Sequence, residues 1–171
     1  MQIPVTHRTL LMNSAATIPD QKSRSRRAIL WAGLTCGVMD ITAASVVNGL
    51  LGVSPIRMLQ GIASGLLGPR SFAGGLATAG LGLLCHFAIA FSAASVYFAL
   101  SRGIRFLVQH AALSGALYGV AVYFFMNRIV VPLSGARRHP FSFELMVIGL
   151  VVHIFCVGLP ISLTVRRYSA R

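Results

Sequence analysis

The sequence is poor in charged side chains, above all in acidic ones. Only 11% of its 171 residues are charged, and three acidic residues stand against fifteen lysines and arginines, for a formal net charge of +12. Soluble domains usually contain about a quarter charged residues, so the composition argues against a water-soluble enzyme. Such a net charge in a soluble protein would suggest nucleic acid. Here the basic residues lie between long apolar runs, which favours membrane topology and no nucleic-acid partner.

Catalytic and metal-binding sequence patterns are also missing. The three cysteines, Cys36, Cys85 and Cys156, form no CxxC pair, so structural zinc is not expected. There is no glycine-rich phosphate loop, no HExxH and no SxxK pattern, and these are the usual sequence signs of nucleotide, zinc-protease and serine chemistry. The sequence therefore identifies no catalytic residues, which favours a role other than catalysis.

Long apolar runs are abundant. A membrane helix needs roughly 20 mainly apolar residues to cross the hydrocarbon core. Four stretches meet this condition, at about residues 28–53, 76–100, 111–131 and 143–165. They predict an all-α polytopic membrane protein, a four-transmembrane-helix bundle in one domain over residues 28–168.

The connection between the first two spans contains signals for a short helix. Ser54–Pro55 provides a capping hydroxyl and a proline at the first helical position, and Gly68–Pro69 provides a stop. The predicted helix, about residues 55–67, is too short to span, so we expect it in the outer interface. Gly61 and Gly65 would also permit a shallow re-entrant helix. Its apolar positions recur at helical spacing: Ile56, Leu59, Ala63 and Leu66.

The distribution of basic residues predicts the orientation. Residues 1–27 are polar and basic, predict a disordered segment, and contain two candidate start residues, Met1 and Met12. Together with the loop after span two and the C-terminal tail, this segment holds ten basic residues: Arg8, Lys22, Arg24, Arg26, Arg27, Arg102, Arg105, Arg166, Arg167 and Arg171. The opposite side holds five: Arg57, Arg70, Arg128, Arg137 and Arg138. The positive-inside rule therefore predicts that both termini are cytoplasmic.

Small residues at helical spacing predict how the helices pack. Close approach at such residues, rather than hydrophobicity, holds helices together in lipid. Gly33 and Gly37 form such a pair in the first span, and Gly115 and Gly119 form one in the third. Pro160 is expected to kink the fourth span.

Arg128 and Glu144 are a candidate ion pair. Arg128 lies near the outer end of the third span, and Glu144 lies near the outer start of the fourth. Their similar predicted depth favours a contact. In the alternative, Arg128 extends to the lipid headgroups.

Three ionisable residues lie near the middle of three different spans. They are Asp40, His86 and His153. A central aspartate costs about 2.5–3.5 kcal/mol on insertion scales, so such residues indicate a functional site by default. Because all three are predicted at one depth, they can form one hydrogen-bonded cluster.

This candidate cluster permits several interpretations. It can act as interhelical glue, or as a proton- or ion-coupled site in a carrier or sensor. His86 and His153 at equal depth would also suit the axial ligation of haem b or, with the nearby cysteines, a copper or zinc ion. Alternatively, the chain is a structural or accessory subunit whose glycine faces dock to a membrane partner or to a second copy.

The chain loosely resembles small four-span bacterial inner-membrane proteins of the YagU-like group. The resemblance covers roughly residues 28–168 and rests on a few positions in the four spans. They are Gly33, Gly37 and Asp40; His86; Gly115 and Gly119; and His153, Gly158 and Pro160. It implies a multi-pass inner-membrane protein without specifying a reaction.

Overall fold

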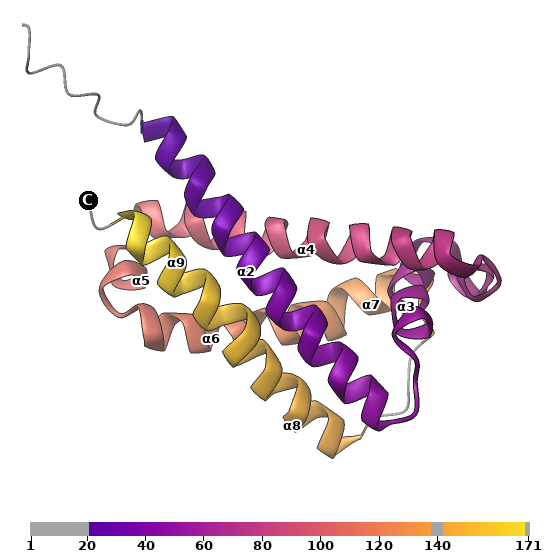
Figure 1. Cartoon of the computed structure of the whole chain (residues 1–171). Coiled ribbons are helices and arrows are strands. Elements are labelled where there is room, and N and C mark those ends of the chain that lie inside the picture. Colours follow the sequence, from indigo (N-terminus) through magenta and orange to yellow (C-terminus); the bar gives the residue numbers. More distant parts are fainter. Residues whose placement is uncertain (1–20, 138–141, 170–171) are drawn as a thin grey trace, which may run out of the picture.

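The computed structural model describes residues 21–137 and 142–169, and every regular element in this part of the chain is a helix (Figure 1). The predicted all-α fold class is confirmed. Four helices are long and apolar enough to cross a membrane: Ser23–Leu50, Gly75–Gly103, Ala111–Leu133 and Phe143–Ser169. The predictions for residues 1–20, and the placement of Arg138 and Arg171, lie outside the described residues.

Two spans are continuous helices and two are interrupted by π-helical segments. The continuous ones are α2 (Gln21–Leu50) and α4 (Gly75–Gly103). The third span comprises α6 (Ala111–Phe125), η2 (Met126–Val130) and α7 (Val131–Leu133). The fourth comprises α8 (Phe143–Val152), η3 (His153–Gly158) and α9 (Leu159–Ser169). The connecting helices are α3 (Pro55–Leu67), the 3-10 helix η1 (Gly68–Ala73) and α5 (Arg105–Gln109). In Figure 1 the start of α2, α5 and the end of α9 lie at one end of the bundle.

The first helix begins earlier than predicted. Helix α2 starts at Gln21, so residues 21–27 are helical and the expected disorder is wrong for this part. Nucleation is the costly step in forming a helix. Once the apolar span is helical, an extension through lysine and arginine, both good helix formers, is inexpensive.

The helix α3 has the predicted boundaries. The hydroxyl of Ser54 accepts a hydrogen bond from the backbone N–H of Arg57 at 3.4 Å, and Pro55 occupies the first turn. At the other end Gly68 adopts φ 60°, a left-handed conformation that favours glycine. These local signals are sufficient to place the helix.

The buried face of α3 differs from the expected apolar face. Ile56 and Leu66 are 45% and 71% exposed, whereas Gln60 and Ser64 are buried together with Ala63. The reason is a close crossing with α4 at Gly82, where an added Cβ would collide with the Leu59 carbonyl oxygen of α3. Small side chains permit such a crossing, and apolar side chains that face lipid lose nothing by staying outside.

Both π-helical segments directly precede a proline. Segment η2 ends two residues before Pro132, and η3 ends two residues before Pro160. A proline lacks the N–H that bonds four residues back, and its ring collides with that carbonyl. A wider π turn relieves this collision. The kink predicted at Pro160 thus takes the form of a π-helical segment.

The predicted packing glycines all lie at helix contacts. A Cβ at Gly37 of α2 would lie 2.7 Å from the ring of Phe87 of α4, and Gly33 adjoins the ring of Phe91 in the same way. A Cβ at Gly119 of α6 would lie 2.5 Å from the carbonyl oxygen of His153. Gly115 faces the fourth span at Gly158 and Ser162. The glycine faces are therefore occupied within the chain.

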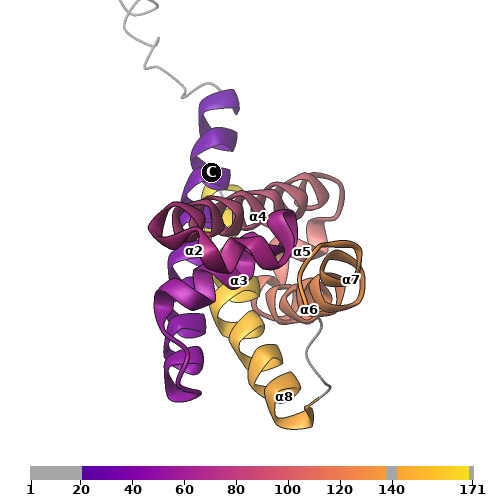
Figure 2. The same cartoon turned by 90° about the vertical axis from the view of Figure 1, so that its right-hand side faces the viewer.

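Arg128 and Glu144 do not form the expected ion pair. Both residues are exposed, and among the described residues no ion pair joins them. Figures 1 and 2 show that α7 and the beginning of α8 diverge, so these two helix ends point to different sides of the bundle. Equal depth along two spans does not bring side chains together when the helices splay apart.

Candidate functional site

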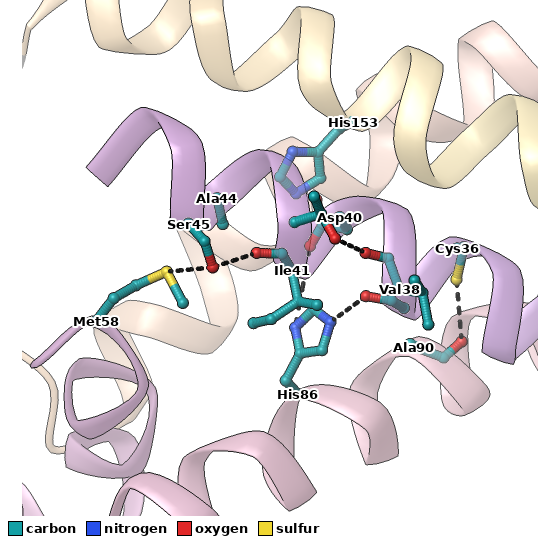
Figure 3. Close-up of polar contacts among 12 residues, drawn as sticks. Cys36, Val38, Asp40, Ile41, Ala44, Ser45, Met58, His86, Ala90 and His153 are labelled. Carbon is teal, nitrogen blue, oxygen red and sulfur yellow. Dashed lines mark hydrogen bonds and ion pairs between the residues drawn. The ribbon is translucent and has the colours of Figure 1, made fainter. Parts of the chain in front are cut away.

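The structure brings Asp40, His86 and His153 to one pocket. The pocket has a volume of about 210 Å³ and is lined from α2, α3, α4, the third span and η3. Its polar lining comprises these three residues and Cys36. In Figure 3 the side chain of Asp40 is drawn between the rings of His86 and His153.

His86 is held by the backbone of α2. Its Nε2 lies 2.9 Å from the carbonyl oxygen of Gly37. The missing side chain at Gly37 admits the neighbouring ring of Phe87, and this close approach of α4 to α2 brings His86 within reach of the carbonyl. The opposite ring nitrogen, Nδ1, lies 4.0 Å from Oδ2 of Asp40. These two side chains are mostly enclosed, at 11% and 21% exposure.

His153 is held by its own helix. It is the first residue of η3, and its Nδ1 lies 2.8 Å from the carbonyl oxygen of Gly149, one turn earlier. The ring of Tyr123 packs edge-on against it, with centroids 5.3 Å apart. These two contacts orient the ring, and Figure 3 shows a ring nitrogen turned toward Asp40.

These hydrogen bonds define where protons reside. A carbonyl oxygen only accepts, so Nε2 of His86 and Nδ1 of His153 each carry the hydrogen. The remaining nitrogens are Nδ1 of His86 and Nε2 of His153. One proton placed between Asp40 and His86 gives either a neutral acid beside a neutral imidazole or a carboxylate beside an imidazolium. At 4.0 Å the two atoms are too far apart for a direct hydrogen bond.

The cysteines do not complete a metal site. The thiol of Cys36 faces the carbonyl oxygens of Gly33 and Ala90, at 3.5 and 3.9 Å, so it serves the contact between α2 and α4. Cys85 and Cys156 are half-buried and free. Within residues 21–137 and 142–169, no three His, Cys, Asp or Glu side chains are grouped to hold a metal ion.

The contacts of the two rings bear on the haem hypothesis. Axial ligation by two histidines needs a free nitrogen from each ring on either side of the iron. Nε2 of His86 faces the Gly37 carbonyl, so the free nitrogens are Nδ1 of His86 and Nε2 of His153. Figure 3 draws the side chain of Asp40 between the two rings, and haem ligation stays a hypothesis.

A second polar cluster lies nearer the end of the bundle that holds the start of α2 and the end of α9. The hydroxyl of Tyr97, a residue only 1% exposed, lies 2.9 Å from both the Leu107 carbonyl and the Ser114 hydroxyl. Tyr118 donates to the Ala93 carbonyl at 2.7 Å, and the two tyrosine rings stack edge-on. Tyrosine and serine are unremarkable in an apolar span, so sequence reasoning missed this cluster.

Comparisons with known proteins provide no relative for this chain. No family model, no curated protein and no solved structure matches it. The likeness to the YagU-like group therefore stays a hypothesis, and the functional argument rests on the geometry of the pocket.

Proposed function

We propose that this chain is a proton-coupled carrier or sensor of the bacterial inner membrane, with Asp40, His86 and His153 as its working residues. The observation that carries the proposal is their meeting at one pocket among four helices suited to crossing a membrane. Asp40 and His86 supply two sites for one proton, 4.0 Å apart. A proton that can occupy either site is the basis for coupling.

The energetic balance favours a proton-coupled role for Asp40 over a purely structural one, in which it only holds the helices together. Burying a central aspartate costs about 2.5–3.5 kcal/mol, whereas an interhelical hydrogen bond in a membrane returns about 0.6–2 kcal/mol. Asp40 and His86 are too far apart for even that direct bond. A residue that costs more than its contact returns is expected to be retained for function.

The accessory-subunit hypothesis loses the feature that motivated it. It assigned the glycine faces to a partner, but Gly37 contacts α4, and Gly119 contacts the fourth span. We propose the lipid bilayer as the direct environment and a cytoplasmic location for the end that holds the start of α2 and the end of α9. Arg24, Arg102 and Arg166 lie on elements of that end, as the positive-inside rule requires. A second copy of the chain remains a candidate partner.

Infrared difference spectroscopy of the reconstituted full chain tests the proposal. The sequence contains only three acids, Asp20, Asp40 and Glu144, so a carboxyl band can be assigned by two substitutions. We expect a carboxyl band in the difference between acidic and alkaline buffer that disappears in Asp40→Asn and persists in the matched control Glu144→Gln. In His86→Gln this band should change, because the proton loses its second site beside Asp40. An Asp40 that keeps one protonation state throughout would refute a proton-coupled role.

A further inference from the structure

The hydrogen-bond donors of the pocket are already used. Besides Asp40, three polar side chains line it, Cys36, His86 and His153. The thiol and one N–H of each ring face main-chain carbonyl oxygens. A neutral imidazole has only one N–H, and a thiol has only one S–H. With neutral rings, these side chains therefore present no donor to a ligand.

What remains on the polar side of the pocket is a set of acceptors. They are the carboxylate of Asp40, Nδ1 of His86 and Nε2 of His153. An anion would meet a carboxylate and two lone pairs without a compensating donor, which is unfavourable in a desolvated site. A ligand that carries several N–H donors and a positive charge matches all three acceptors.

The rest of the wall is apolar. It includes Ile41 and Ala44 of α2, Ile62 of α3, Val122 and Met126 of the third span, and Val157 of η3. The volume of about 210 Å³ exceeds the roughly 150 Å³ of an engineered apolar cavity that accommodates benzene. The pocket thus has room for an ammonium group and a compact body of a few carbon atoms.

We infer that this pocket binds a small primary ammonium compound. The charged nitrogen donates to Asp40 and the two imidazole nitrogens, and the carbon body packs against the apolar wall. This inference rests on the proposed function and names its ligand class. The ammonium and the resident proton use the same acceptors, so binding of one disfavours the other.

Calorimetric titration of the purified full chain in detergent tests the ligand class with three probes of similar size. n-Butylammonium has a charge and N–H donors, tetramethylammonium has the charge alone, and butyrate has the opposite charge. We expect saturable binding of n-butylammonium, binding of tetramethylammonium weaker by about tenfold or more, and no binding of butyrate. Equal binding of both cations would overturn the donor argument, and binding of butyrate would overturn the inference as a whole.

Two variants of α2 locate the binding. Asp40→Asn should weaken n-butylammonium by about tenfold or more, since it removes the charge that pairs with the ligand. Thr42→Val is the matched control, because Thr42 is exposed on the same helix and its hydroxyl is bonded to its own turn at 2.7 Å. Thr42→Val should bind as the wild type does. Equal affinity in wild type and Asp40→Asn would overturn the assignment to this pocket.

The two proposals fail separately. The infrared titration of Asp40 needs no ligand, so it reports on the proton-coupled role alone. A titrating Asp40 in a protein that does not bind n-butylammonium overturns the ligand inference and leaves the proposed function standing. If n-butylammonium binds but Asp40 keeps one protonation state, the proton-coupled role is overturned and the ligand inference stands.

Discussion

The contact of Gly158 with the third span tests how the bundle is held together. A Cβ added at Gly158 would lie 2.6 Å from the backbone nitrogen of Gly119 and would collide with the carbonyl oxygen of Gly115. These are backbone atoms on a neighbouring helix, so they cannot turn aside as a side chain can. Gly158→Ala must push the third and fourth spans apart.

Overpacking a well-packed site typically costs about 1–3 kcal/mol. We expect the upper end of this range, about 3 kcal/mol, because separating two helices also loosens the contacts at Gly115 and Gly119. Reversible unfolding in mixed detergent micelles, followed by circular dichroism, measures the free energy of unfolding. The effect should be a clear shift of the midpoint toward lower denaturing detergent.

The matched control is Gly80→Ala on α4. A Cβ there would meet nothing within 4 Å, and alanine is about 1 kcal/mol better than glycine in a helix. Gly80→Ala should therefore be neutral or slightly stabilising. A Gly158→Ala variant as stable as the wild type would refute close backbone packing as the source of stability.

Three further substitutions probe other parts of the fold. Ser54→Ala removes the cap of α3 and should cost about 1 kcal/mol, seen as faster amide exchange in the first turn of α3 and nowhere else. Tyr97→Phe should cost about 1–2 kcal/mol in the same unfolding assay. Tyr168, half-buried near the end of α9, is the control, and Tyr168→Phe should cost less; equal losses from both variants would refute a stabilising role for the Tyr97 cluster. Pro160→Ala should restore α-helical bonding before residue 160, detectable as new amide protection, and an unchanged exchange pattern would refute proline as the cause of η3.

The parts of the fold that sequence reasoning predicted are those with local causes. The span positions follow from composition over about 20 residues, and α3 follows from Ser54–Pro55 and Gly68. The meeting of Asp40, His86 and His153 at one pocket followed from their similar depth in three spans. The depth of a residue in its span follows directly from its position in the sequence.

The parts that were missed depend on how each helix rotates about its own axis and on the angles between helices. The buried face of α3 is set by its crossing with α4 at Gly82. In lipid, apolar side chains are tolerated on the outside of a helix, so hydrophobicity does not indicate which side faces inward. The separation of Arg128 from Glu144 follows from the splay of α7 and α8 (Figure 2). The Tyr97 cluster depends on which side chains meet across three elements. Neither the rotation of a helix about its axis nor the angle between two helices follows from a local sequence pattern.

The π-helical segment η3 has a consequence for how sequence changes in the fourth span are understood. A π turn accommodates one residue more than an α turn, so it offsets the angular register of everything that follows by about 100°. Residues of α8 and α9 therefore cannot be placed on one helical wheel. Each half of the span has its own inward face, and deleting a single residue between 153 and 158 would remove the extra residue, so that the segment closes as an α turn while α8 and α9 keep their inward faces.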